Sequence, residues 1–322
     1  MGQTRSTIVL AGATGHIGRA VAAELLAQRR HHTLLSRAAP TNDDDEQRRT
    51  HTVELTHADS VRNVLSSGAI DTVISCLASR TGVRDDAWAI DYQANRNLLD
   101  AAVAAGARHF ILLSAICVQK PRLEFQQAKL AFERELVASG LTYSIVRPTA
   151  FFKSLSGQVP RVLAGKPFLV FGDGQVTACK PISEVDLARY IVECIDDGER
   201  RNKILPIGGP GEAITPREQG ELLFRLADRQ PRFRSVPVRV FDIAAALATP
   251  FGWVSSAAAA KAELARIGKY YATESMLLWN EESRRYDAEA TPSYGTVTLE
   301  QHYTRILSDG LGGYEAGEQR LF

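Results

Sequence analysis

Three glycines near the N-terminus have the spacing of a phosphate-binding turn. Gly12, Gly15 and Gly18 follow the apolar run Ile8-Val9-Leu10-Ala11 and open a segment with helical spacing of apolar residues. The first glycine permits a tight turn, the second lets backbone approach a pyrophosphate, and the third lets helix meet strand. A helix N-terminus adds unpaired N–H groups and a positive dipole end. The motif predicts a dinucleotide site, and the alternative is a tight turn with no ligand. The residues expected to bind the cofactor here are Gly12, Thr14, Gly15, His16, Ile17 and Gly18.

The end of the second predicted strand indicates which nicotinamide cofactor is used. An NAD-dependent enzyme would place Asp or Glu there for the ribose hydroxyls. This chain has Ser36-Arg37 instead. A guanidinium suits a 2′-phosphate, so we expect NADPH with Arg37 as a contact. An exposed surface arginine is the alternative.

Lys129 is the candidate catalytic residue. It lies on the apolar helical face of Phe125, Phe132 and Leu136, where a lysine commonly extends its ammonium toward water. The G-x-x-G-x-x-G spacing and this helix resemble the short-chain dehydrogenase/reductase superfamily, in its extended or atypical branch. Its members carry Tyr-x-x-x-Lys on the corresponding helix, which implies that Lys129 holds the nicotinamide ribose.

Phe125 occupies the tyrosine position of that pattern. Phenylalanine can neither donate nor accept a proton, which argues against reduction of a ketone. A carbon–carbon double bond conjugated to a large π-system has no such need, because hydride adds to carbon and the charge spreads into the ring. The departure alone does not choose between such a reductase and a non-catalytic binder.

The elements that position these residues alternate between strand and helix through the first half of the chain. Strands that are apolar on both faces and separated by helices predict a parallel sheet covered on both sides. The expected fold class is α/β, a doubly wound Rossmann fold. The expected strands span 8–11, 33–36, 52–55, 72–77, 109–114 and 143–146, and the clearest helices span 95–105 and 125–139. The strand ends should supply a second cofactor wall of Leu77, Ala78, Ser79, Ser114, Pro148, Thr149 and Phe151.

After Arg147-Pro148 the alternation breaks into Pro- and Gly-punctuated segments. We expect an NAD(P)-binding core over 1–157 and a smaller substrate-binding or lid region over 158–322, interleaved with the core. Two helix starts are clear, at Ser183 and at Thr215-Pro216.

Composition excludes several classes of protein. The 322 residues are 45% hydrophobic and 23% charged, with a net charge of +1, so the chain can bury a full core and lacks the basic surplus of a nucleic-acid binder. Cys76, Cys117, Cys179 and Cys194 have no metal-site spacing, which predicts free thiols and no metal. With no transit segment before the first strand, we expect a cytoplasmic protein.

The stretch from Val240 to Ala260 has Asp242 as its single charge. Its length would allow a membrane span, but Pro250, Gly252 and many alanines favour a buried helical hairpin. Peripheral contact with a membrane surface is the alternative.

Several blocks resemble one family, the NADPH-dependent divinyl chlorophyllide a 8-vinyl reductases. They cover nearly the whole chain and include segments that cofactor binding alone would not dictate; the resemblance is loose over 37–49 and in the last dozen residues. The blocks span 75–82, 90–92, 113–121, 123–126, 147–155, 179–184, 205–211 and 291–295.

The resemblance implies an oxidoreductase of chlorophyll or bacteriochlorophyll synthesis, with NADPH as cofactor and a magnesium tetrapyrrole as substrate. Hydride transfer would convert the 8-vinyl group of divinyl chlorophyllide a, or of its protochlorophyllide relative, to ethyl. A flat tetrapyrrole needs an apolar slot and a cation for its propionate. The candidate substrate contacts are Phe125, Phe152, Lys153 and Phe171, with Lys120 and Lys180 as further candidate cations.

Two other classes fit a dinucleotide fold without the tyrosine. One is a sensor that binds NADP and does no chemistry. The other is an assembly factor of a membrane complex, supported by the Val240–Ala260 stretch alone. Consumption of bound NADPH separates the reductase from both.

Overall fold

The computed structural model describes residues 8–37, 47–66, 68–249 and 255–309 of the chain. Within these, the chain forms two compact units. Unit 1 takes the described residues of the ranges Met1–Ser79, Arg84–Arg147 and Leu187–Leu205, and unit 2 takes those of Arg80–Val83, Pro148–Asp186 and Pro206–Phe322. The predicted division of roles between 1–157 and 158–322 stays a prediction.

A seven-stranded sheet is the centre of unit 1. Its strands are β1 (Ile8–Ala11), β2 (His32–Ser36), β3 (Arg48–Thr52), β4 (Thr72–Ser75), β5 (His109–Leu113), β6 (Thr142–Pro148) and β8 (Lys203–Ile207), in the order β3-β2-β1-β4-β5-β6-β8. The pairs from β3 through β6 are parallel. The chain order reverses beside β1, and such sheets bind ligands at the carboxyl ends of the strands at that point. The predicted doubly wound fold is confirmed.

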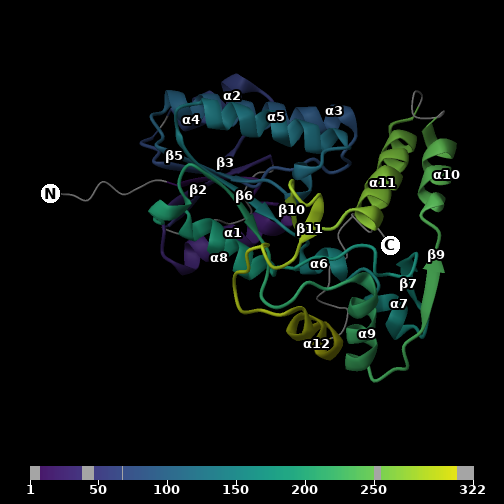
Figure 1. Ribbon diagram of the computed structural model, residues 1–322. Helices are drawn as coiled ribbons and strands as arrows, with labels where there is room; N and C mark the ends of the chain where they lie inside the picture. The colour runs from purple at the N-terminus through teal and green to yellow at the C-terminus, as the bar shows by residue number, and fades with distance from the viewer. Residues whose placement is uncertain (1–7, 38–46, 67, 250–254, 310–322) are drawn as a thin grey trace. The chain divides into compact units, whose positions relative to one another are not determined.

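Helices cover both faces of this sheet (Figure 1). One layer contains α2 (Ala58–Leu65), α4 (Asn95–Ala104) and α5 (Glu124–Ala138); the other contains α1 (His16–Ala27) and α8 (Glu184–Glu193). Phe110 of β5 and Phe132 of α5 are fully buried, with ring centroids 5.8 Å apart. Short helices complete the unit: α3 (Arg84–Ala87), the π-helical η1 (Trp88–Ala94), and the 3₁₀ turns η2 (Ile116–Gln119) and η3 (Gly198–Arg200).

Unit 2 is built around one apolar cluster. Phe168, Leu223, Phe224 and Tyr303 are each at most 2% exposed and come from three elements that lie far apart in the sequence. Those elements include β7 (Phe168–Phe171), which pairs in parallel with β9 (Phe233–Val236), and the flanking helices. The helices of unit 2 are α6 (Phe152–Leu155), α7 (Val159–Leu163), α9 (Pro216–Leu226), α10 (Arg239–Ala248), α11 (Ser256–Thr273) and α12 (Leu299–Asp309). The unit also contains the antiparallel strand pair β10 (Leu278–Asn280) and β11 (Arg285–Asp287).

Both predicted helix starts are confirmed. Thr215 caps α9 in a capping box: its hydroxyl accepts from the Glu218 N–H, and the Glu218 carboxylate accepts from the Thr215 N–H at 2.8 Å. Ser183 precedes α8, and its hydroxyl accepts from the Asp186 N–H at 3.0 Å. Each cap satisfies backbone donors that the first helical turn leaves without partners.

The third strand lies elsewhere than predicted. The sequence places it at 52–55, whereas β3 spans Arg48–Thr52. β3 is an edge strand with polar, partly exposed side chains, and an edge needs no apolar pattern. Val53 and Leu55, which attracted the prediction, are buried just after the strand ends.

The predicted helical hairpin exists but is not buried as predicted. α10 and α11 pack along each other, yet α10 has no buried residue. Ile243 and Leu247 are 60% and 69% exposed. Residues 250–254, which join the helices and include Pro250 and Gly252, lie outside the described residues. No helix of the described residues is long and apolar enough to cross a membrane.

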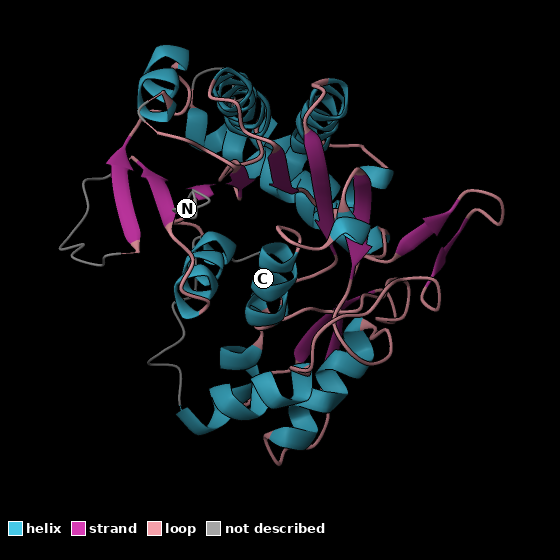
Figure 2. Ribbon diagram, turned by 90° about the vertical axis from the view of Figure 1, so that its left-hand side faces the viewer, coloured by secondary structure: helices cyan, strands magenta, loops and turns pink. Residues whose placement is uncertain are grey.

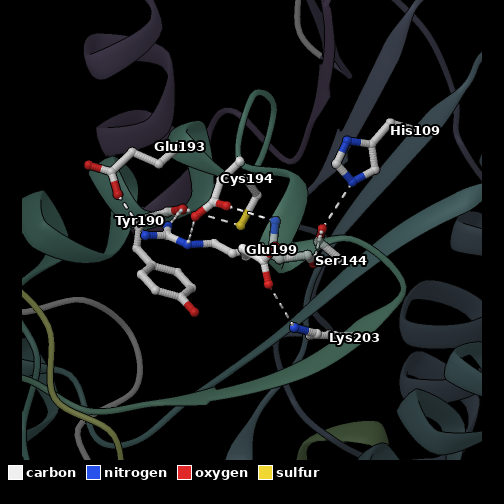
Figure 3. Close-up of polar contacts among 9 residues, drawn as sticks. His109, Ser144, Tyr190, Glu193, Cys194, Glu199 and Lys203 are labelled. Atoms are coloured by element: carbon white, nitrogen blue, oxygen red, sulfur yellow. Dashed lines mark hydrogen bonds and ion pairs between the residues drawn. The ribbon is translucent and has the colours of Figure 1, made fainter.

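A polar network joins α8 to the amino ends of β5 and β6 (Figure 3). The Arg200 guanidinium lies over the Tyr190 ring at 3.9 Å and pairs with Glu193 and Asp197, both at 2.9 Å. Ser144 donates its hydroxyl proton to the Arg200 carbonyl at 2.8 Å. That hydroxyl therefore accepts from His109 Nε2 at 2.9 Å, and His109 Nδ1 is buried with no hydrogen-bond partner.

This environment makes His109 a source of acid sensitivity. Burial lowers its pKa from 6.5 to about 4. Between these values the unfolded chain binds more protons than the folded chain, so stability is full above pH 6.5 and falls as the pH drops toward 4. By pH 5 the loss is about 2 kcal/mol. Urea unfolding at pH 7.5 and pH 5 should show this loss in the wild type and in the exposed-histidine control His51→Gln. It should be absent in His109→Gln, and an equal loss there would contradict the account.

Candidate functional site

The predicted phosphate turn joins β1 to α1 with very little space. Gly12 has φ of 81°, and a Cβ there would lie 2.6 Å from the Cys76 carbonyl oxygen. A Cβ on Gly18 would lie 2.0 Å from the Gly12 carbonyl oxygen. Neither position tolerates a side chain, because each places backbone against backbone. The start of α1 is therefore held tightly against the ends of β1 and β4.

The N-terminus of α1 suits a bound phosphate. Its N-cap is Gly15, which has no side chain to occupy the free N–H groups, and its first turn holds no acidic residue. Thr14 and Gly15 are exposed and His16 is half-buried, while Ile17 packs inward. Arg19 supports the turn by donating to the Thr14 carbonyl at 2.8 Å. Free N–H groups and the positive helix end are the features that a pyrophosphate requires.

Arg37 follows β2 directly and is exposed. It contributes to the lowered pKa of Glu54, after the larger contribution of hydrogen bonds from Thr56. Residues 38–46 lie outside the described residues, so the structure defines only the start of this loop. Arg37 as a contact for a 2′-phosphate stays a prediction.

Lys129 of α5 forms a buried ion pair that the sequence does not predict. Its ammonium lies 2.9 Å from a carboxylate oxygen of Asp91, and the two side chains are 11% and 0% exposed. The Asp91 carboxylate also accepts from the Ser79 N–H at 3.3 Å. Asp91 lies in the π-helical segment η1, and such local departures from α-helix are frequent at functional sites.

These contacts bring several predicted site residues to one edge of the sheet. Gly12 lies against Cys76, and Ser79 is linked through Asp91 to Lys129. Burial raises the pKa of Cys76 to about 12, and the nearby Lys129 charge only partly opposes this. Cys76 and Cys117 are 9% and 1% exposed, so both are small buried residues. Leu77 is half-buried and Ala78 is exposed on the same segment.

Phe125 is half-buried in the first turn of α5, one turn before Lys129. Gln126 fixes this end of the helix. Its side-chain oxygen accepts from the N–H groups of Arg122 and Leu123 at 2.7 and 2.9 Å, and its nitrogen donates to the Cys117 carbonyl at 3.3 Å. The helix that positions Lys129 is thus tied to the turn after β5.

Ser114, at the end of β5, is engaged by a second buried pair. Its hydroxyl donates to Glu133 at 2.5 Å, and Glu133 also pairs with Arg147 at the end of β6. Glu133 lies one turn after Lys129 on α5. Sequence reasoning missed Asp91 and Glu133. The one signal that could have indicated them is an acidic residue on a helix face that otherwise carries apolar side chains.

The remaining predicted residues belong to unit 2. Pro148 and Thr149 are buried, and the Thr149 N–H donates to the Ile207 carbonyl at 2.9 Å. Phe151 forms an isolated parallel β-bridge with Ile182. Pro148, Thr149 and Phe151 as cofactor contacts stay predictions, because the structure does not place the two units relative to each other.

The predicted substrate contacts of unit 2 differ in exposure. Phe152 is 1% exposed and packs on His302 with centroids 5.0 Å apart, an arrangement typical of core. Lys153 is half-buried on α6. Phe171 is half-buried, and its ring lies 4.8 Å from that of Phe241. Lys180 is buried and donates to two uncharged oxygens, the Thr291 carbonyl at 3.1 Å and the Ser293 hydroxyl at 3.2 Å.

The fold and the glycine turn define an NAD(P)H-binding protein, and residues 12–198 match a family model described as NAD(P)H-binding. A divinyl chlorophyllide a 8-vinyl-reductase from Oryza sativa subsp. indica is 50% identical, with 99% of this chain and 83% of the relative covered. A cucumber (Cucumis sativus) relative of the same name is 47% identical, covering 98% and 80%. The chain belongs to the divinyl chlorophyllide a 8-vinyl-reductase family.

A solved structure supports the fold. The complex of leucoanthocyanidin reductase from Vitis vinifera with NADPH superimposes with a TM-score of 0.69, covering 94% of this chain and 100% of that one. The two sequences are 14% identical, so the likeness concerns the fold.

The Lys129–Asp91 pair gives a stability prediction. Asp91→Asn leaves a buried ammonium without its counter-charge and should lower the free energy of unfolding by about 3 kcal/mol. Adding Lys129→Met removes that charge and should restore most of the loss. Asp59→Asn, which breaks the exposed Arg62–Asp59 pair, is the control and should leave stability almost unchanged. Urea titration of the wild type and these three variants measures this; a double variant no more stable than Asp91→Asn would contradict a direct pairing.

Proposed function

We propose that this chain reduces the 8-vinyl group of divinyl chlorophyllide a, or of divinyl protochlorophyllide a, to an ethyl group with NADPH. Membership of a family whose relatives align over nearly the whole chain at 45–50% identity is the observation that carries this proposal. The alignment extends through unit 2, far beyond the residues needed for cofactor binding. The protein is an oxidoreductase acting on a CH–CH bond.

The described residues fit the cofactor. The cradle at Gly12 and Gly18 admits no Cβ, and no side chain of the N-cap residue covers the end of α1, where a pyrophosphate would bind. When bound, the reduced nicotinamide supplies a hydride. Lys129, held on one side by Asp91, is expected to position the nicotinamide ribose. Ser79 and Ser114 lie at the carboxyl ends of β4 and β5, where the cofactor wall is expected.

The residue types around Lys129 agree with reduction of a carbon–carbon double bond. Phe125 supplies no acid for a carbonyl oxygen, and none is needed when hydride adds to a vinyl carbon. The second vinyl carbon takes up a proton, so the substrate gains two hydrogens and NADPH becomes NADP⁺.

Unit 2 is expected to bind the tetrapyrrole. Phe171 and Lys153 remain its candidate contacts because both are partly exposed, whereas the burial of Phe152 favours a packing role. Phe125 is the candidate contact from unit 1.

The curated relatives are described as chloroplastic. A photosynthetic compartment agrees with the proposed substrate, and a cytoplasmic location or a role in bacteriochlorophyll synthesis stays a prediction.

The preference for NADPH over NADH is attributed to Arg37. Arg37→Ala should raise the Kd for NADPH about tenfold, because a charge-assisted contact with the 2′-phosphate is lost, and should leave the Kd for NADH unchanged. Arg62→Ala, another exposed arginine, is the matched control. Fluorescence titration of both cofactors measures the two constants; an equal loss for NADPH and NADH would contradict the assignment.

The reaction itself is tested with purified protein, divinyl chlorophyllide a and NADPH, with pigments separated by chromatography and identified by mass. We expect a gain of two hydrogens. The Asp91→Asn, Lys129→Met double variant, in which no buried charge is left unpaired, should lower kcat/KM about a hundredfold. Lys203→Met, at an exposed lysine, should not. Tight NADPH binding with no conversion would overturn the reductase and favour the sensor.

A further inference from the structure

The outer face of α10 is apolar and exposed. Val240, Ile243 and Leu247 recur at helical spacing and are 43%, 60% and 69% exposed. We call these three residues the α10 stripe. Ala244, which lies next to this stripe on the helix, is also exposed. Single exposed apolar residues are ordinary, but a continuous apolar helix face in water indicates an interaction site.

The opposite face of α10 is already used within unit 2. The Phe241 ring lies against Phe171 at 4.8 Å and fills the space that a Cβ on Gly268 would need. Asp242 pairs with Lys269 of α11 at 2.6 Å. These contacts fix the rotation of α10, so the stripe faces away from α11 as a consequence of the packing.

Basic residues precede the stripe along the chain. Arg232, Arg234 and Arg239 are exposed and flank or lie within β9 and the first turn of α10. No acidic residue occurs between Arg229 and Phe241. Among the residues that the structure describes, none of the three arginines pairs with a carboxylate. Figure 1 shows β9 leading directly into α10.

We propose that the α10 stripe and these three arginines dock the protein onto an anionic lipid bilayer. The stripe would enter the boundary between headgroups and acyl chains, and the arginines would contact lipid phosphates. α10 has 10 residues, too short to span a bilayer, which agrees with a helix lying in the surface. A second copy of the chain suits this surface less well, because a twofold contact would bring the same arginines of both copies together.

Vesicle flotation tests this without any pigment, so its outcome is independent of the proposed reductase activity. Phosphatidylcholine vesicles are compared with vesicles that also contain phosphatidylglycerol. The wild-type protein should float with the anionic vesicles and bind neutral vesicles about tenfold less. Ile243→Ser with Leu247→Ser should weaken binding about tenfold, and Arg232→Ser with Arg234→Ser should do so to a similar degree.

The matched control is Val103→Ser with Val137→Ser, two exposed valines on α4 and α5 of unit 1 that are 48% and 46% exposed. It should bind vesicles like the wild type. NADPH titration confirms that each variant is folded. Two results would overturn the proposal: no flotation of the wild type with anionic vesicles, or undiminished flotation of the stripe variant. A wild-type oligomer that the stripe variant dissociates, with no vesicle binding, would assign the surface to a second copy.

Discussion

The close approach of backbone to backbone at the end of β1 is the constraint on which the rest of the site depends. Gly18 reaches within contact of Gly12, and Gly12 in turn lies against the Cys76 carbonyl after β4. Because no side chain intervenes, the start of α1 is pressed into the point where the sheet order reverses. That position is where a doubly wound sheet opens its strand ends to a ligand. The helix N-terminus and the strand ends thereby become one surface for a dinucleotide.

The same edge carries the buried charges of unit 1. Lys129 pairs with Asp91, and one turn further along α5 Glu133 pairs with Arg147 and holds Ser114. Buried pairs of this kind contribute little net stability, but breaking one is costly, so they hold their side chains in place. The position of the Lys129 ammonium is thus determined before any cofactor arrives. A preorganised cation suits hydride transfer, in which the geometry of the nicotinamide decides the rate.

The glycine turn and the parallel sheet could be predicted because their causes are local. The glycine spacing around Gly12 and the apolar runs of the central strands can be recognised from neighbouring residues in the sequence. β3 could not, since a polar edge strand leaves no hydrophobic pattern. Asp91 could not, because its partner lies on another helix and it sits in a π-helical segment.

Two further features depended on tertiary packing. The hydrophobic pattern of a helix does not show whether its apolar face is buried in a core or lies at the surface. The exposure of α10 could therefore not be predicted from the sequence. The sequence predicts a second region interleaved with the core, but which segment belongs to which unit depends on packing, as with Leu187–Leu205 in unit 1. Figure 2 shows the helices and strands that result.

The central claim is that a hydride passes from the nicotinamide to the 8-vinyl group. It is tested most directly with NADPH deuterated at C4 of the nicotinamide, on the face from which hydride leaves, and divinyl chlorophyllide a as substrate. The account predicts one deuterium in the new ethyl group, found by mass and located by NMR, with one equivalent of NADP⁺ formed. Ethyl product without deuterium from either labelled face, or unchanged pigment in the presence of bound cofactor, would contradict it.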